Sequence, residues 1–341
     1  MPDLLRFTDK GIYCAEGDFY VDPWCPVARA VLTHAHADHA RPGSRAYLAT
    51  PYAQSVLRLR LGEDIHLDTM PYGAARTIGG VRVSFHPAGH IRGSAQVRVE
   101  HKGEVWVASG DYKTDPDGQV EPFEPVQCHA FITESTFGLP IYRWTPQAEL
   151  QRDLNEWWRN NAARGLTTCV FGYSLGKAQR LLGLVDPSIG PIYVHGAVHN
   201  VNEALRADGM VLPDCTRVTG DMKKGAFEGA LVVAPPSALN TPWMRRFSPY
   251  VTGYASGWMA LRGARRRRAA DRGFILSDHA DWDGLWSAVR ATGAERVFVT
   301  HGYKAVFARW LREQGLDAHD ADTQYEGEQE ESAAEAQTDA A

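Results

Sequence analysis

Three histidines and one aspartate stand close together in the segment Thr33–His39, which reads THAHADH. Neutral imidazole and carboxylate groups are suitable ligands for Zn²⁺. Two such ions can divide the four side chains when the loop presents its first two histidines to one side and Asp38 with His39 to the other. Alanines at the intervening positions leave room for this arrangement. A solvated histidine loop is the alternative, but this density of ligand types favours a metal site.

Further metal-ligand types stand where predicted strands end. They are His90, Asp111 and His301, each beside or near a glycine. The strands that precede them are expected at residues 81–85, 104–108 and 296–300. Loops at one edge of a sheet can bring such residues together around a pair of ions. The predicted ligands are His34, His36 and His90 for one ion, Asp38, His39 and His301 for the other, and Asp111 as a bridge between them.

The pattern of apolar residues that must position these ligands changes near residue 140. Before it, short runs such as Val81–Phe85 and Ala130–Thr133 predict a strand-rich segment with few long helices. From Pro146 onward, apolar residues at helical spacing alternate with short strands, and this alternation continues to Leu311. This order of elements predicts an α/β protein.

Composition narrows the class of protein further. The chain has 341 residues, of which 44% are hydrophobic and 10% aromatic, enough to bury a substantial core. Charged residues interrupt the N-terminus, and no window offers the about 18 uncharged apolar residues of a membrane helix, so we expect neither a signal peptide nor a membrane span. The five cysteines are widely spaced and form no C-x-x-C pair, which favours a cytoplasmic protein over a disulfide framework.

Residues 317–341 differ in composition from the rest of the chain. They contain nine acids and no lysine or arginine, which predicts a disordered acidic tail. Residues 1–316 therefore hold all 36 basic residues against 32 of the 41 acids, a net charge of about +4. A body of this charge can tolerate a polyanionic ligand, although the charge alone does not identify one.

The ordered set of motifs resembles the metallo-β-lactamase superfamily. His34–His39 matches its signature H-x-H-x-D-H, and Asp22 in VDP stands at the position of its early aspartate. His90 and Asp111 stand at its third and fourth motifs. The resemblance implies that Asp22 orients a ligand histidine through its carboxylate.

Three later motifs resemble those of the β-CASP nucleases. They are centred on Glu134 in FITEST, His279 in LSDHADW and His301 in THG. The similarity covers almost all of residues 1–316 and is greatest to the bacterial ligase-associated DNA exonucleases, relatives of Artemis and the cross-link-repair nucleases. It implies a four-layer αβ/βα sandwich built from two parts of the chain, with an inserted α/β cap. The expected boundaries are 1–141 and 271–316 for the metallo-β-lactamase domain, 142–270 for the β-CASP cap and 317–341 for the tail.

The resemblance implies a phosphodiesterase that uses two divalent ions, Zn²⁺ or alternatively Mn²⁺. Two ions about 3.5–4 Å apart can activate a water and neutralise charge on the phosphoryl oxygens. We expect Asp38 to orient the nucleophile as well as to bind an ion. His279 is expected to act as general acid, or phosphate-oxygen donor, for the leaving 3′-oxygen, with Glu134 holding its tautomer.

Two segments outside the metal motifs could contact nucleic acid. Gly172–Lys177, which reads GYSLGK, lies between a predicted strand and a helix, where backbone N–H groups can meet a phosphate. A plain turn fits the spacing equally well, but similarity to the cross-link-repair nucleases implies that Ser174 and Lys177 seat a terminal phosphate. An arginine run can follow a phosphate backbone or form a solvated turn. Its members are Arg262, Arg265, Arg266, Arg267 and Arg268.

We therefore expect a two-metal DNA exonuclease that acts from a 5′ end in DNA repair. The resemblance implies an ATP-dependent DNA ligase or a repair helicase as partner. His301 stands where the DNA-type members usually carry valine, so a zinc-dependent ribonuclease is the alternative. A catalytically inactive scaffold subunit and a small-molecule hydrolase are further alternatives. The intact ligand set argues against the first, and the presence of Glu134 and His279 argues against the second.

Overall fold

The computed structural model describes residues 3–263 and 270–325, which form two compact units. Of the described residues, unit 1 contains 3–142, 207–209 and 278–325. Unit 2 contains 143–206, 210–263 and 270–277. Each unit mixes strands and helices, so the chain is an α/β protein. No helix among the described residues has the length and apolar character to cross a lipid bilayer.

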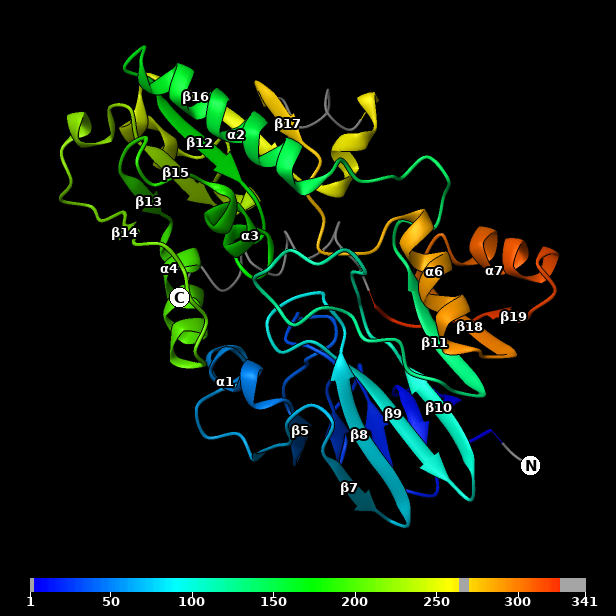
Figure 1. Cartoon of the computed structure of the whole chain (residues 1–341). Helices are drawn as coiled ribbons and strands as arrows, with labels where there is room; N and C mark the ends of the chain where they lie inside the picture. The colour runs from blue at the N-terminus through cyan, green and yellow to red at the C-terminus, as the bar shows by residue number, and fades with distance from the viewer. Residues whose placement is uncertain (1–2, 264–269, 326–341) are drawn as a thin grey trace. The chain divides into compact units, whose positions relative to one another are not determined.

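Unit 1 contains two sheets (Figure 1). The first has the order β1(Arg6–Phe7), β2(Ile12–Cys14), β3(Phe19–Val21), β4(Ala30–Val31), β5(Tyr47–Ala49) and β6(Leu67–Thr69). The second has the order β19(Asp317–Asp320), β18(Arg296–Gly302), β11(Ala130–Ser135), β10(Glu104–Ala108), β9(Ala95–His101), β8(Val81–Pro87) and β7(Ala75–Ile78). The helices of the unit are α1(Gln54–Leu61), α6(Trp282–Thr292) and α7(Lys304–Glu313), and η1(Pro51–Ala53) is a 3₁₀ turn.

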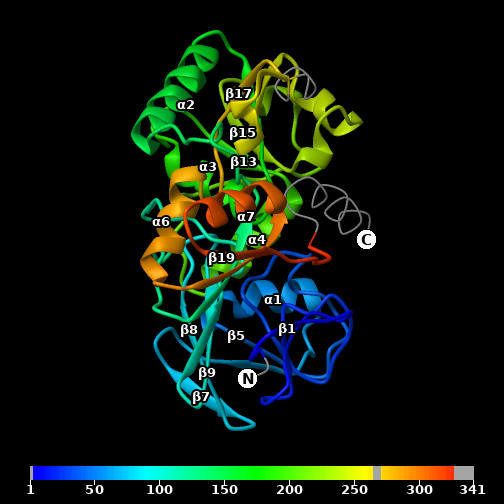
Figure 2. The ribbon, with the colours of Figure 1, turned by 90° about the vertical axis from the view of Figure 1, so that its right-hand side faces the viewer.

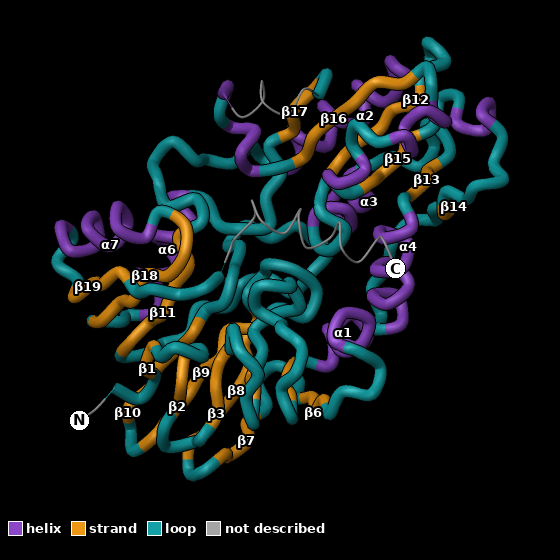
Figure 3. Tube along the Cα trace, turned by 180° about the vertical axis from the view of Figure 1, so that it is seen from behind, coloured by secondary structure: helices purple, strands orange, loops and turns teal. Residues whose placement is uncertain are grey.

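Successive side chains of each strand point to opposite faces of the sheet, and this divides the core of unit 1 into two layers. Trp106 and Ala108 of β10 join a cluster that also contains Phe19 and Val21 of the first sheet, so the two sheets pack face to face. Figure 3 shows β1–β3 and β8–β10 from behind. Val107 of β10 points the other way, into a cluster with residues of α6 and α7. These two helices cover the outer face of the second sheet (Figure 2).

Unit 2 contains one sheet whose neighbouring strands are all parallel. Its order is β14(Thr216–Arg217), β13(Ile192–Val194), β15(Leu231–Ala234), β12(Thr167–Phe171), β16(Tyr250–Ala255) and β17(Arg272–Phe274). The helices are α2(Gln147–Ala162), α3(Lys177–Leu184) and α4(Gly196–Ala207), and the 3₁₀ turns are η2(Lys224–Phe227), η3(Pro236–Ala238), η4(Pro242–Phe247) and η5(Gly257–Ala260). Leu231 and Val233 pack against the α2–α3 side, whereas Val232 and Ala234 pack against the 3₁₀ turns. Burial on both faces is typical of a parallel sheet.

Residues 317–325 correct the expected start of the acidic tail. Asp317–Asp320 forms β19, which pairs in parallel with β18, and Ala318 is buried in the core of unit 1. The acidic composition was misleading because β19 is an edge strand that buries only Ala318, so its acidic side chains stay exposed. Residues 326–341 of the expected tail lie outside the described residues.

Candidate metal centre

The predicted metal ligands meet at one edge of the sheets of unit 1. Asp111 follows β10 and His301 lies near the end of β18, and because β10, β11 and β18 run in parallel, their carboxyl ends share an edge. His90 follows β8, which runs in the same direction as β10. The loop 34–39 follows β4 of the facing sheet. The predicted ligands are all buried, the most exposed being His301 at 8%.

Four of these residues form a first cluster, His34, His36, His90 and Asp111, whose potential ligand atoms all lie within 4.8 Å of one another. Asp111 Oδ2 is 3.6 Å from His34 Nε2 and 3.8 Å from His90 Nε2. His36 Nδ1 is 3.0 Å from His90 Nε2. The structure therefore brings the three histidines predicted for one ion to the same carboxylate.

A second cluster shares Asp111 with His39 and His301. Asp111 Oδ2 is 3.6 Å from His39 Nε2, and Asp111 Oδ1 is 3.0 Å from His301 Nε2. Asp38 Oδ2 lies 3.6 Å from His39 Nε2. Asp111 thus stands between the two predicted groups of ligands, where a bridging carboxylate would have to lie.

Neighbouring oxygens select one tautomer for most of these histidines. His39 Nδ1 donates to Asp22 Oδ2 at 2.8 Å, and His90 Nδ1 donates to the Asp278 carbonyl at 2.8 Å. His34 Nδ1 is 3.0 Å from Thr33 Oγ1, which itself donates to Asp22 Oδ2 at 2.5 Å. A proton on Nδ1 leaves Nε2 as the atom that can bind a metal.

The donor set fits divalent metal ions. Nε2 of His34 and Nε2 of His39 are buried and make no hydrogen bond to any of the described residues. Buried polar atoms are rarely left without a partner, and imidazole and carboxylate ligands suit Zn²⁺ or Mn²⁺. The clusters therefore have the composition and the unsatisfied atoms of a divalent metal site.

Burial and charge move the pKa values of these histidines in opposite directions. Burial, and then the charge of His39, hold the pKa of His34 well below its usual range. Burial, and then the charge of Arg60, lower the pKa of His36 to about 4. Burial also acts to lower the pKa of His39, but Asp38, Asp111 and Asp22 outweigh it and raise that pKa to about 10. The carboxylates around His39 therefore favour its protonated form, whereas burial disfavours protonation of His34 and His36.

His279 and Glu134 form a hydrogen-bonded pair beside the clusters. His279 Nδ1 lies 2.9 Å from both carboxylate oxygens of Glu134, and 4.0 Å from Asp111 Oδ2. The backbone N–H of Tyr112 donates to Glu134 Oε1 at 2.8 Å, which fixes the carboxylate. Glu134 therefore favours the form of His279 that carries a proton on Nδ1.

Ser174 and Lys177 lie together in unit 2 at the turn between β12 and α3, and both are buried. The Lys177 ammonium lies over the Tyr173 ring, 4.8 Å from its centroid. Gln179 closes the turn because its side chain accepts from the Gly176 N–H at 2.7 Å and donates to the Ser174 carbonyl at 2.9 Å. Lys177 is the first residue of α3.

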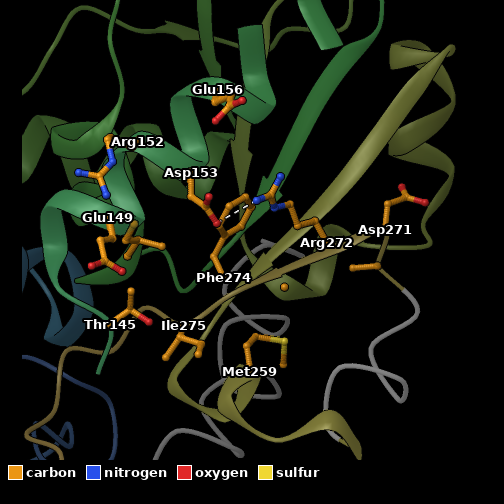
Figure 4. A pocket seen from close by; sticks show the side chains of 13 residues that line it. Thr145, Glu149, Arg152, Asp153, Glu156, Met259, Asp271, Arg272, Phe274 and Ile275 are labelled. Carbon is orange, nitrogen blue, oxygen red and sulfur yellow. Dashed lines mark hydrogen bonds and ion pairs between the residues drawn. The ribbon is translucent and has the colours of Figure 1, made fainter. Parts of the chain in front are cut away.

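The arginine run is described only in part. Arg262 is exposed, whereas Arg265, Arg266, Arg267 and Arg268 lie outside the described residues. The neighbouring Arg272 lines a pocket of unit 2 with Asp153 and Phe274 (Figure 4). Its guanidinium donates to Asp153 at 2.8 Å and lies over the Phe274 ring. Arg272 therefore stabilises the contact between β17 and α2 within the unit.

Sequence reasoning missed three contributors to the centre. Thr33 and the Asp278 carbonyl each orient a ligand histidine, and Tyr325 stacks on His39 with ring centroids 4.2 Å apart and an interplanar angle of 12°. A backbone carbonyl leaves no signal in residue type. For Tyr325 the available signal was a lone aromatic residue within the acidic stretch 317–341.

Comparison with known proteins finds relatives named for acting on nucleic acids. The chain is 32% identical over 321 residues to a probable DNA ligase of Opitutus terrae, a match that covers 93% of this chain and 31% of that protein. It is 31% identical over 133 residues to the endoribonuclease YSH1 of Gibberella zeae, covering 36% of this chain and 16% of that protein. The YSH1 endoribonuclease of Saccharomyces cerevisiae is 26% identical over 122 residues, with 35% and 15% covered.

The chain thus spans about a third of the length of the ligase-named relative and about a sixth of the endoribonucleases. No protein-family model matches the chain. Among solved structures, a protein of unknown function from Enterococcus faecalis V583 aligns with a TM-score of 0.57 at 10% identity, covering 81% of this chain and 76% of that one. This likeness extends to the fold alone.

Proposed function

We propose that the chain is a two-metal phosphodiesterase that degrades DNA from a 5′ end. The observation that carries the proposal is the placement of Asp111 between two groups of buried histidines, beside the His279–Glu134 pair. Similarity to proteins named endoribonuclease and DNA ligase supports a nucleic-acid substrate. The corresponding fold is a metallo-β-lactamase αβ/βα sandwich for unit 1, which includes β19, and a β-CASP cap for unit 2.

The metal ligands divide between two ions in this proposal, with Zn²⁺ the first candidate and Mn²⁺ the second. When bound, the ions lower the pKa of a water molecule and neutralise charge on the phosphoryl oxygens. The ligands of one ion are His34, His36 and His90, those of the other are Asp38, His39 and His301, and Asp111 bridges them. Asp22 and Thr33 hold the ligand imidazoles in the required tautomer.

The chain's own acid–base group is His279. With Nδ1–H donated to Glu134, the imidazolium form of His279 can deliver its Nε2 proton to the leaving 3′-oxygen of the phosphodiester and becomes the neutral Nδ1–H tautomer. Asp38 accepts a hydrogen bond from the attacking water and so aims the water at phosphorus. These assignments separate the residues that bind metal from the residue that moves a proton.

In this proposal, the turn that contains Ser174 and Lys177 makes the enzyme start from a 5′ end. A buried Lys177 at the first turn of α3, with Ser174 beside it, can neutralise and hydrogen-bond a 5′-terminal phosphate. Arg262 and the following arginines would contact the phosphate backbone. The ligase-named relative supports a role in DNA repair. The partner in this proposal is an ATP-dependent DNA ligase or a repair helicase, and the location is the cytoplasm.

A zinc-dependent ribonuclease is the second candidate, and one observation favours it specifically. His301 completes the second ligand cluster, as in the RNA-processing β-CASP enzymes, and the similarity to the YSH1 endoribonucleases covers about a third of this chain. RNA cleavage would use the same ions and the same His279–Glu134 pair. The two candidates therefore differ in substrate selection only.

The deciding experiment compares 5′-phosphorylated DNA, 5′-hydroxyl DNA and RNA of the same sequence, each labelled at either end, with metal-assayed protein. We expect mononucleotides from the 5′-phosphorylated DNA and little cleavage of RNA. An Asp38→Ala variant purified in parallel controls for contaminating nucleases. Preferential RNA cleavage would establish the ribonuclease instead, and inactivity of the metal-replete protein on all three substrates would refute both candidates.

A further inference from the structure

The segment that follows β19 runs over the second ligand cluster of unit 1. Lys304 Nζ donates to the Ala321 carbonyl at 3.3 Å and also pairs with Asp322. Arg41 Nη2, two residues after the ligand His39, donates to the Gln324 carbonyl at 3.0 Å. These contacts at two points bring the next residue, Tyr325, to the centre.

Tyr325 contacts the second cluster through both its ring and its hydroxyl. The ring stacks on His39 with centroids 4.2 Å apart and planes inclined by 12°, and it meets His301 edge to face at 5.6 Å. Its hydroxyl donates to the Asp22 carbonyl at 3.1 Å. Trp24 packs edge-on at 5.6 Å and fixes the phenol ring. One side chain therefore contacts two predicted ligands and the residue that orients one of them.

We propose that Tyr325 is a positioning residue that holds His39, and with it the second metal ion, in place. This inference rests on the proposed two-metal function. It assigns a role at the centre to the segment 321–325, which the acidic composition had placed in a tail.

The physical basis is that an imidazole held by one hydrogen bond can still tilt about its Cβ–Cγ bond. His39 is held by Nδ1 to Asp22 Oδ2, which restrains one edge of the ring. A flat aromatic ring stacked on its face removes the remaining rotation, so Nε2 points towards Asp38 and Asp111. Because the ring is already restrained, less side-chain entropy is lost when an ion binds.

The hydroxyl adds a second restraint through the backbone of Asp22. Asp22 has a φ of 42°, a left-handed conformation that is uncommon for residues other than glycine. Such a conformation persists when surrounding contacts over-determine it. The Thr33 N–H donates to Asp22 Oδ1 at 2.7 Å, and the Tyr325 hydroxyl restrains the carbonyl of the same residue. Tyr325 therefore supports both the ligand ring and its carboxylate partner.

The test compares full-length wild-type protein with Tyr325→Ala, Tyr325→Leu and Tyr325→Phe. Each metal-free protein is titrated with Zn²⁺, and separately with Mn²⁺, by calorimetry against a competing chelator, and bound metal is counted after desalting. We expect Tyr325→Ala to weaken the second ion by roughly tenfold to a hundredfold and to leave the first unchanged. Tyr325→Phe keeps the stack and should stay within about threefold of wild type.

Tyr13→Ala is the matched control, because the Tyr13 ring packs at a tilt against Tyr20 of the same unit and contacts none of the predicted ligands. If Tyr325→Ala fails to fold, Tyr325→Leu fills the space without an aromatic face and should show the same selective loss. Wild-type affinity for both ions in Tyr325→Ala and Tyr325→Leu would overturn the inference. An equal loss of affinity at both sites in these two variants would also overturn it. A wild-type protein that binds fewer than two ions would instead refute the proposed metal pair, and the inference with it.

Discussion

At the scale of single residues, the chemistry of the centre depends on which nitrogen of each imidazole carries a proton. His39 and His90 each commit Nδ1 to an oxygen and direct Nε2 towards Asp111. His279 commits Nδ1 to Glu134 in the same way. Its partner is a carboxylate whose position is fixed by the Tyr112 N–H. The same tautomer is therefore favoured in all three histidines, so the tautomer alone does not separate the predicted ligands from the proposed acid–base group.

Replacing His279 by alanine should separate these roles. We expect turnover to fall by roughly 10²–10⁴-fold, because a positioned proton donor is lost, while the number of bound ions is unchanged. Glu134→Gln should lose less, about tenfold to a hundredfold, because the ring remains but its tautomer is no longer fixed. Steady-state rates with saturating metal and elemental analysis of the same samples give both quantities. A fall in metal content for His279→Ala would show that His279 is itself a ligand.

At the scale of secondary structure, the ends of the strands determine where the ligands meet. Asp111 follows Gly110, whose φ is 58°, at a point where the loop after β10 approaches Thr33. A Cβ at Gly110 would lie 2.5 Å from Thr33 Oγ1, the hydroxyl that connects Asp22 with His34. Only glycine allows this approach without displacing the loop.

Gly110→Ala should therefore destabilise the protein and damage the centre. We expect a loss of about 2–4 kcal/mol in the free energy of unfolding, from backbone strain and the contact with Thr33. Gly103→Ala is the control, because Gly103 has a φ of 85° but no atom within 4 Å of an added Cβ. Gly103→Ala should lower the free energy of unfolding by only about 1–2 kcal/mol, because it adds backbone strain without a steric clash. Urea unfolding of both variants measures the difference, and equal losses would contradict the proposed clash.

At the scale of the whole molecule, metal binding should be linked to the stability of unit 1. The ligands come from distant parts of the chain, residues 34–39 and residue 301, and the unfolded chain does not hold them together. An ion that binds only the folded state, present at 100 times its dissociation constant, stabilises that state by about 2.7 kcal/mol. For a domain of about 150–250 residues this raises Tm by roughly 5–10 °C.

This stabilisation should increase with pH. The metal-free protein holds a proton on His39, whose pKa is raised to about 10, and an ion at Nε2 must displace it. That proton stabilises the metal-free fold below about pH 6.5, and the stabilisation is lost as pH rises towards 10. Metal affinity should rise about tenfold per pH unit between pH 7 and 9.

Scanning calorimetry with Zn²⁺ and with EDTA measures the difference in Tm between the two forms, and Asp111→Asn serves as the unresponsive control. We expect the difference to widen from pH 7 to pH 9. A difference that stays constant over this range would mean that His39 is neutral in the metal-free protein.

The sequence by itself determined the types of chemical group and their local order. The alternation in Val81–Phe85 and Glu104–Ala108 predicted strands that the structure contains as β8 and β10, because the period of a strand is visible in the residues. The spacing in His34–His39 predicted ligands, because imidazoles at such density have few other uses. These signals are local and need no knowledge of the fold.

Tertiary structure alone decided which groups meet. Nothing in residue types indicates that the Asp278 carbonyl receives His90, or that Tyr325 lies on His39 across 286 positions of sequence. The acidic composition of 317–325 predicted disorder, yet pairing of β19 with β18 satisfies its backbone and places Tyr325 at the centre. Backbone hydrogen bonds and aromatic stacking are available to almost any sequence, so only the folded arrangement shows where they form.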